Sequence, residues 1–271
     1  MLNILVSIKQ VPDTTNIRIN PETGTLIREG VPSIINPYDV VALSAAYYLK
    51  IKYGGFITAI SMGPPQAKLA LKEAVEFGVD RIILLSDRKF AGADTLATSY
   101  TLAETIKYLN EERPFDLYLF GKQAIDGDTG QVGPGVAARL NIPVITYVSK
   151  IEDLDLNNRT IIVHRKIEKG TEILKAKLPV LLTCEKDLAK LPFVPFSEIM
   201  KAVRAEPEIF TAEGPVKFER EKLGLKGSPT QVKKVFTPEI KKDTILYDLN
   251  STPLEVVIEK IIQILKEKKF L

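Results

Sequence analysis

The 271-residue sequence contains no tryptophan, one cysteine and one histidine. A lone cysteine, Cys184, excludes an intramolecular disulfide framework and suits a reducing compartment. With only His164 beside it, the sequence offers neither a Cys/His zinc cluster nor a choice of histidines for a serine triad. No apolar run approaches the ~18 residues needed to span a bilayer. The sequence therefore argues against a disulfide-stapled, a zinc-binding or a membrane-spanning protein.

The charge balance excludes further classes of partner. Hydrophobic residues make up 45% and charged residues 26% of the chain, and the net charge is only +3. Because Lys and Arg are scattered among Asp and Glu, we expect no nucleic-acid partner and no direct membrane insertion. Residues 2–8 form an apolar strand without a basic segment before it, so we expect no signal peptide and a cytoplasmic location.

Strand and helix patterns alternate through the first 150 residues. Short, continuous apolar strands separated by helices are typical of a sheet covered on both faces. The order predicts an α/β fold with a doubly wound, mostly parallel sheet, whose ligands lie beyond the carboxyl ends of the strands. The predicted strands are 2–8, 56–61, 81–85, 116–120 and 144–148, and the predicted helices are 36–50, 66–77 (ended by Gly78), 94–109 and 129–140.

After residue 150 the pattern changes to short strands joined by hairpin turns at Asn157-Asn158 and Lys169-Gly170. We place a nucleotide-binding domain at 1–204 and an arm for subunit assembly at 205–271. The remaining predicted segments are strands at 151–156, 160–167, 171–176 and 179–184, irregular chain at 186–198, weakly patterned chain at 199–226, an extended arm at 227–252 and a helix at 253–269.

The Gly-rich turn from Gly121 to Gly133 is the most informative segment. It follows an apolar strand and leads into a helical pattern near Thr129. Glycines allow close backbone approach, and free N–H groups at a helix start attract anions, so the turn resembles a phosphate cradle. An ordinary connecting loop is the alternative, because the turn is neither a P-loop nor a GxGxxG motif. We expect Asp126 and Asp128 to cap the helix rather than to act in acid–base catalysis.

A second polar turn, 86–100, contains Asp94, a predicted N-cap, with Thr95 and Thr98 in the first helical turn. The alternative to simple capping is that these groups bind a second phosphate or a ribose, and two helix starts would suit a diphosphate.

We expect His164 to be a solvent-facing strand residue and Cys184 a small buried one. Binding turns without catalytic residues point to a redox cofactor that brings its own chemistry. The turns at the predicted ligand edge are 9–15, 61–65, 86–95 and 121–132.

Together these segments resemble the β subunit of electron transfer flavoproteins, over residues 2 to about 204. This implies a Rossmann-like fold of the adenine-nucleotide α-hydrolase-like kind. The matching segments are Val6-Ser7-Ile8-Lys9-Gln10-Val11-Pro12-Asp13, Ile35-Asn36-Pro37-Tyr38-Asp39, Ser61-Met62-Gly63-Pro64-Pro65, residues 86–100, Gly121 to Gly133, Leu178-Pro179-Val180-Leu181-Leu182-Thr183, and Pro195 to Lys201.

The 86–100 segment is similar to the version in electron-bifurcating and nitrogen-fixation-associated members. That resemblance implies FAD in this subunit where ordinary members hold AMP. It also implies a heterodimer with an FAD-carrying α subunit, NADH as electron donor, and electrons split between two acceptors. The residues that match nucleotide contacts or adjoin them are Ser7, Lys9, Asn36, Asp39, Met62, Gly63, Asp94, Thr95, Thr98, Gln123, Ala124, Asp128, Thr129, Gly130, Gln131 and Val132.

The sequence departs from the family pattern at Lys169 and within the loop Glu185 to Phe196. That loop corresponds to the family's docking loop for a redox partner or further subunit. Two alternatives stay open. One is a non-bifurcating β subunit that holds a structural AMP and has the only redox FAD in its partner. The other is a nucleotide-binding sensor protein without redox activity.

Overall fold

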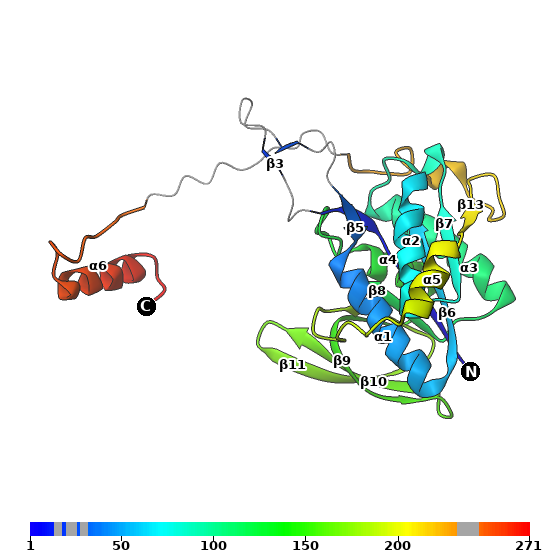
Figure 1. Cartoon of the computed structure of the whole chain (residues 1–271), viewed down its shortest axis with the longest axis horizontal. Helices are drawn as coiled ribbons and strands as arrows, with labels where there is room; N and C mark the ends of the chain where they lie inside the picture. Colours follow the sequence, from blue (N-terminus) through cyan, green and yellow to red (C-terminus); the bar gives the residue numbers. More distant parts are fainter. Residues whose placement is uncertain (14–17, 20–25, 28–31, 232–243) are drawn as a thin grey trace. The chain divides into compact units, whose positions relative to one another are not determined.

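The structure, a computed structural model, describes residues 1–13, 18–19, 26–27, 32–231 and 244–271. The chain divides into two compact units, Met1–Lys233 and Lys234–Leu271. The first unit is built on a nine-stranded sheet of order β11-β10-β9-β12-β8-β1-β6-β7-β13 (Figure 1). Its strands are β1 Leu2–Ser7, β6 Gly55–Met62, β7 Arg81–Leu85, β8 Leu117–Gly121, β9 Val144–Asp155, β10 Thr160–Ile167, β11 Gly170–Lys177, β12 Val180–Cys184 and β13 Glu208–Phe210.

The sheet is parallel from β9 to β13, and its antiparallel pairings are those of β10 with β9 and with β11, which confirms a doubly wound, mostly parallel sheet. Two further antiparallel pairs lie outside it, β2 with β5 and β3 with β4. Their bounds are Gln10–Pro12 and Ser33–Ile35, and Arg18–Ile19 and Leu26–Ile27.

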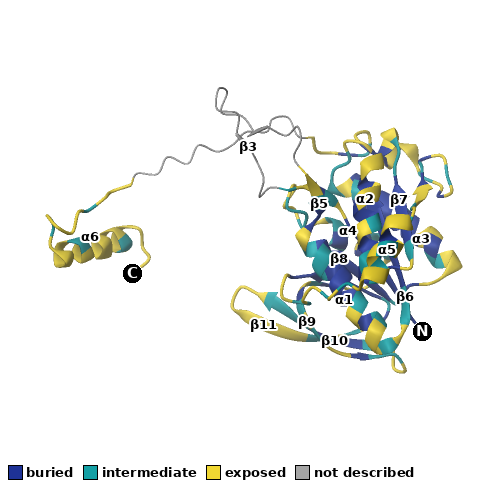
Figure 2. Cartoon of the chain, viewed as in Figure 1, coloured by how far each residue is buried: buried dark blue, intermediate teal, exposed yellow. Residues whose placement is uncertain are grey.

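Helices cover both faces of the sheet. Successive side chains of a strand point to opposite faces, and in β1 Ile4 and Val6 pack with α1, α2 and α5 while Leu5 packs with α3 and α4. Figure 2 shows the central strands buried between these layers. The helices are α1 Pro37–Tyr53, α2 Lys68–Ala74, α3 Thr95–Glu112, α4 Val132–Leu140 and α5 Phe196–Arg204, with 3-10 turns η2 Pro65–Ala67, η3 Val75–Phe77, η4 Arg88–Phe90 and η5 Arg220–Lys222.

The helix predicted at 66–77 is a 3-10 turn, a short α-helix and a second 3-10 turn in sequence. It ends at Gly78 with φ 72°, as predicted, because a left-handed residue after a helix favours glycine.

The strands predicted at 144–148 and 151–156 form one strand, β9. Its first part pairs in parallel with β12 and its later part antiparallel with β10. Tyr147 has a φ of 57°, which bends the strand between the two partners. The predicted hairpins at 157–158 and 169–170 do connect β9 to β10 and β10 to β11.

Residues after 204 continue in the first unit. Strand β13 extends the sheet beside β7, and Arg81 at the start of β7 forms two hydrogen bonds with Glu208 of β13, at 2.7 and 2.9 Å. The second unit contains α6, Leu254–Glu267, close to the predicted 253–269. Residues 232–243 of the predicted arm lie outside the described residues. Among the helices that the structure describes, none is long and apolar enough to cross a membrane.

Candidate nucleotide-binding site

The loops after the parallel strands meet at one edge of the sheet. In the register, Ser7 at the end of β1 lies beside Ile60 of β6 and Phe120 of β8, and Met62 lies beside Leu85. Because β1 has β6 on one side and β8 on the other, the strand order reverses there, and α/β sheets bind ligands at such a point. The described parts of turns 9–15, 61–65, 86–95 and 121–132 all follow strands that end at this edge.

The loop between β8 and α4 presents a row of free N–H groups. Helix α4 begins at Val132, so the predicted start near Thr129 is wrong by three residues. Asp128 and Gly130 have φ values of 56° and 64°, so the backbone turns twice before the helix begins. Within the described chain, the backbone N–H groups of residues 129–132 have no hydrogen-bond acceptor. Such groups before a helix N-terminus suit an anion.

Neither Asp126 nor Asp128 caps α4, so that prediction is wrong. The N-cap is Gln131, which makes no side-chain capping bond. Asp126 instead accepts hydrogen bonds of 2.7 and 2.8 Å from the Lys9 ammonium, and Asp128 accepts one from the Gln123 amide. Both carboxylates are therefore engaged away from the helix start, which leaves its N–H groups free.

Asn36, the buried residue before α1, ties α1 to this loop. Its Nδ2 donates to the Gln123 carbonyl at 2.9 Å, and its Oδ1 accepts from the Ile125 N–H at 3.1 Å. The Asn36 backbone N–H donates to the Lys9 carbonyl at 2.8 Å. One residue thus connects the loop after β1, through its backbone, with the loop after β8, through its side chain.

Asp39 makes the same connection one helical turn later. Its Oδ2 accepts from the Lys9 N–H at 2.7 Å and its Oδ1 from the Gly121 N–H at 3.1 Å. Burial of the carboxyl raises its pKa to about 7, although the hydrogen bonds from Asn36, Lys9 and Gly121 and the Lys9 charge act in the opposite direction.

The second predicted helix start, at α3, lies against the first. Asp94 is the N-cap, as predicted, and accepts two N–H bonds from the first turn at 2.9 and 3.1 Å. The Thr95 hydroxyl donates to Gln131 Oε1 at 2.8 Å. The Thr98 N–H donates to the Asp94 carbonyl, so it is not free for a ligand. The two turns therefore form one continuous surface.

The other oxygen of Asp94 anchors a later segment. It accepts from the Thr230 N–H at 3.1 Å and from the Thr230 hydroxyl at 2.8 Å. The Asp94 N–H in turn donates to the Ser228 hydroxyl at 2.8 Å. Desolvation opposes ionisation, but hydrogen bonds from Ala97, Thr230 and Leu96 outweigh it and hold the pKa of Asp94 below its usual value. Both oxygens of the Asp94 carboxylate therefore already accept hydrogen bonds from within the protein.

The remaining candidates also lie at this edge. Gly63 donates its N–H to the Leu85 carbonyl at 3.0 Å, and the Ala124 carbonyl accepts from the N–H groups of the next turn. Ser7 is buried at the end of β1, and Met62 is half-buried at the end of β6. The structure therefore brings all the candidate residues to one edge of the sheet, and their contact with a nucleotide stays a prediction.

Lys122 is a neighbour of the site that sequence reasoning missed. Its ammonium lies 3.2 Å from the Glu185 carboxylate and 5.2 Å from the centre of the Tyr147 ring. Desolvation lowers the pKa of Lys122, but the pairing with Glu185 outweighs it and leaves the pKa raised. This cluster depends on β12 lying beside β8, and the only sequence signal was a lysine next to Gly121.

His164 and Cys184 take no part in the described site. His164 of β10 bonds to the exposed Glu152 carboxylate of β9. Cys184 is fully buried, and burial together with the nearby Asp39 charge raises the pKa of its thiol. Among the described residues, no group of three or more His, Cys, Asp or Glu side chains could hold a metal ion.

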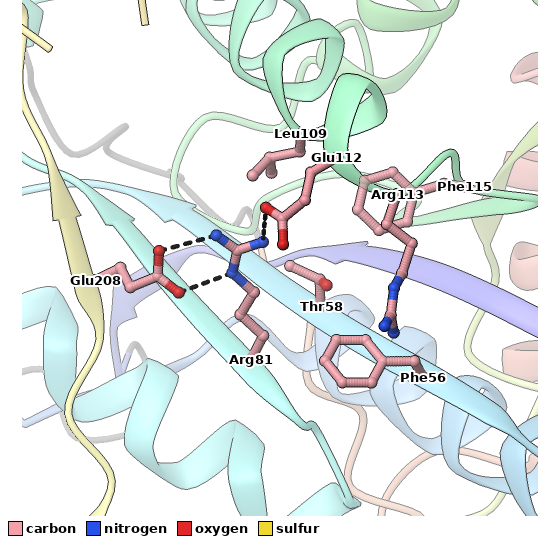
Figure 3. A pocket seen from close by; sticks show the side chains of 8 residues that line it. All are labelled: Phe56, Thr58, Arg81, Leu109, Glu112, Arg113, Phe115 and Glu208. Carbon is pink, nitrogen blue, oxygen red and sulfur yellow. Dashed lines mark hydrogen bonds and ion pairs between the residues drawn. The ribbon is translucent and has the colours of Figure 1, made fainter. Parts of the chain in front are cut away.

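A pocket of about 250 Å³ lies at the opposite edge, where β6 and β7 begin (Figure 3). Arg81 is held there by Glu208 and by Glu112, the latter at 2.8 Å. The Arg113 guanidinium lies over the Phe56 ring at 4.2 Å. Because Arg81 of β7 pairs with one carboxylate from β13 and one from α3, this cluster joins the three elements, and it is separate from the nucleotide edge.

Comparison with known proteins agrees with this geometry. Residues 23–214 match the model of the electron transfer flavoprotein domain. The chain is 47% identical over 270 residues to the electron transfer flavoprotein subunit beta of Clostridium acetobutylicum, with 100% of both chains covered. It is 47% identical to protein FixA of Azotobacter vinelandii, over 88% of this chain and 85% of the relative. It is 45% identical to the caffeyl-CoA reductase-Etf complex subunit CarD of Acetobacterium woodii, over 98% and 99%. The chain therefore belongs to the electron transfer flavoprotein family, as a β subunit of the FixA-like subgroup that acts in electron transfer.

Proposed function

We propose that this β subunit binds FAD at the carboxyl edge of its sheet and works in flavin-based bifurcation, passing electrons from NADH to two acceptors. The main support is the contact between the N-termini of α3 and α4. There the Thr95 hydroxyl donates to Gln131, next to the free N–H groups of residues 129–132. The similarity to CarD, a subunit of a reductase-Etf complex, and to FixA supports a bifurcating role.

The residues present fit a phosphate-bearing cofactor. Free N–H groups at 129–132 and the partial positive charge of α4 would neutralise a phosphate, and Gly130 offers a face without a side chain. FAD supplies the redox chemistry when bound, by accepting and releasing electrons. The chain's own residues bind the phosphates and orient the cofactor, and no residue here is required as an acid or base.

One observation favours the AMP alternative. The Asp94 carboxylate occupies the first N–H groups of α3, and Thr230 occupies its other oxygen. The Thr95 hydroxyl already donates to Gln131, so the α3 start offers a phosphate little beyond the Thr95 N–H, and a single phosphate at 129–132 would suffice. The sensor alternative has no comparable support, because the chain belongs to an electron-transfer family.

We also propose that an electron transfer flavoprotein α subunit is the partner, bound in part by residues 205–271. In the second unit, α6 carries exposed apolar side chains, among them Ile258 and Ile261, and has no buried residue. For the redox partner or further subunits we propose the loop at 185–196, where Leu191, Phe193 and Phe196 are 69%, 87% and 74% exposed. Exposed apolar clusters of this kind are typical of protein-binding surfaces.

Counting the nucleotides tests the cofactor proposal. The chain is co-produced with its α subunit, and the purified heterodimer is extracted with acid. Two FAD and no AMP are expected, whereas one FAD with one AMP would select the alternative. Gly130→Val should empty the β site, because a branched side chain at a left-handed residue is strained and blocks close approach. Gly127→Ala is the matched control, since its Cβ would meet no atom within 4 Å; unchanged retention in Gly130→Val would refute the assignment.

A further inference from the structure

We propose that Asn36 and Asp39 are positioning residues that set the 121–126 loop before a nucleotide binds, and that their side chains do not contact the nucleotide. The proposal rests on the proposed function for the identity of the ligand. It changes the role that family resemblance gave these two residues, from ligand contact to preorganisation of the contact loop.

The hydrogen-bonding capacity of the Asn36 amide is directed at the loop. Its nitrogen donates to Gln123 and its oxygen accepts from Ile125, and only 1% of the residue is exposed. Asn36 makes no capping bond to α1, and besides its side-chain interaction with the Asp39 carboxyl its polar contacts go to this loop. A ligand would have to displace a buried hydrogen bond in order to reach it.

The Asp39 carboxylate fits between the ends of two neighbouring strands. Each oxygen takes one N–H, from Lys9 after β1 and from Gly121 at the end of β8, and 6% of the residue is exposed. A Cβ at Gly121 would lie 2.1 Å from Asp39 Oδ1 and 2.9 Å from the Tyr38 Cβ. Glycine at 121 is therefore what allows the carboxylate to hold β8 and β1 at this spacing.

Lys9 adds a further connection to the 121–126 loop. Its N–H binds Asp39 while its ammonium binds the Asp126 carboxylate at 2.7 and 2.8 Å. The loop is thus fixed at residues 121, 123, 125 and 126, and the free N–H groups at 129–132 follow directly. A shift at Gly121 would move the groups proposed to bind phosphate.

Ionisation of Asp39 provides a readout that a purely structural residue would not give. The two oxygens accept N–H bonds most strongly when the carboxyl is ionised, and burial raises its pKa to about 7. The charged or titratable groups around it are the Lys9 ammonium and the Cys184 thiol, with the Lys122–Glu185 pair one residue beyond Gly121 and Cys184. Burial and the Asp39 charge raise the pKa of the thiol, so it stays neutral between pH 6 and 8.

The test compares Asp39→Asn with Asp80→Asn in the full-length chain. Asp80 is a matched control, because its carboxylate accepts the Ile57 N–H at 2.9 Å and the Lys50 ammonium near the opposite edge of the sheet. FAD and AMP are titrated separately between pH 6 and 8.5. At pH 8 Asp39→Asn should weaken binding by about tenfold or more, as expected for a lost bond to a charged acceptor, and Asp80→Asn should not. With FAD, whose diphosphate does not titrate in this range, the wild type should bind more weakly as the pH falls through 7, while Asp39→Asn should show a flat profile.

Amide hydrogen exchange without nucleotide separates this proposal from the proposed function. Asp39→Asn should speed exchange in peptides covering 121–131, whereas Asp80→Asn should leave them unchanged. Wild-type affinity and wild-type exchange in Asp39→Asn would overturn the positioning role. If exchange is faster in Asp39→Asn but the wild type binds neither FAD nor AMP, the positioning role is supported and the proposed function is refuted. If Asp39→Asn does not fold, Asn36→Ala tests the same loop by the same exchange measurement, and unchanged exchange would again overturn the role.

Discussion

Gly133 in the first turn of α4 provides a sharp test of how this helix is seated on the sheet. A Cβ at this position would lie 2.9 Å from Thr183 Cγ2, 3.5 Å from Leu181 Cδ2 and 3.6 Å from the Phe120 Cβ. All three residues are buried, so the neighbours have little room to move. Gly133→Ala should therefore push the start of α4, and the loop before it, away from β12.

Two opposing effects set the magnitude. Overpacking a tight core costs ~1–3 kcal/mol, while Ala in place of Gly inside a helix gains ~1 kcal/mol. The net loss in unfolding free energy should be about 1 kcal/mol. Thr183→Ser removes the Cγ2 atom and keeps the hydroxyl that accepts the Tyr147 N–H at 3.0 Å. In that background the clash is absent, so Gly133→Ala should become stabilising by up to ~1 kcal/mol.

The assay is urea unfolding of the full-length chain followed by far-UV circular dichroism, because the sequence has no tryptophan to report by fluorescence. The four proteins of the double-mutant cycle are compared directly, and Gly127→Ala serves as a control whose added Cβ meets open space. If Gly133→Ala changes the unfolding free energy by the same amount in the wild type and in the Thr183→Ser variant, the contact with Thr183 Cγ2 does not determine how α4 packs on the sheet.

Three further measurements test other parts of the structure. Because burial raises the pKa of Asp39 from 3.8 to about 7, the folded chain holds a proton there that the unfolded chain has lost. The Asp39 contribution to the unfolding free energy, taken as wild type minus Asp39→Asn, should therefore fall as the pH rises from 4 to 7, by up to ~4 kcal/mol, and a difference that does not change with pH would contradict this. Glu208→Gln should lower stability by ~1 kcal/mol or less, given the partial exposure of its pair with Arg81, and the loss should shrink in high salt; a loss that does not change with salt would mean that the pair acts by packing. Deleting residues 253–271 should weaken pairing with the α subunit while nucleotide binding persists, and pairing at full affinity would show that α6 serves another role.

The strongly periodic elements of this fold were predictable from the sequence. The apolar runs of β1, β6, β7 and β8 and the N-cap Asp94 lie where local patterns placed them, because burial and capping act over a few residues. Strand β13 was missed, since two of its three residues are exposed and its pairing with β7 is long-range.

Within the site, sequence reasoning located the loops but not their bonding. The start of α4 was misplaced because two left-handed residues precede it, and one of them is an aspartate. The bond between Asp39 and Gly121 joins residues 82 positions apart in the chain, and no local pattern encodes it. The contact between Asp94 and Thr230 spans 136 positions and is invisible for the same reason.

This last contact has a practical consequence for shortened forms of the protein. Ser228 and Thr230 complete the bonding of Asp94, so a chain cut at 204 or at 226 would leave one oxygen of the Asp94 carboxylate and the Asp94 N–H without these partners beside the candidate nucleotide site. Such a protein would lose nucleotide through a damaged helix start, and the loss would be mistaken for proof that the missing arm binds the cofactor itself. Shortened forms made for crystallisation or calorimetry should therefore end no earlier than residue 231.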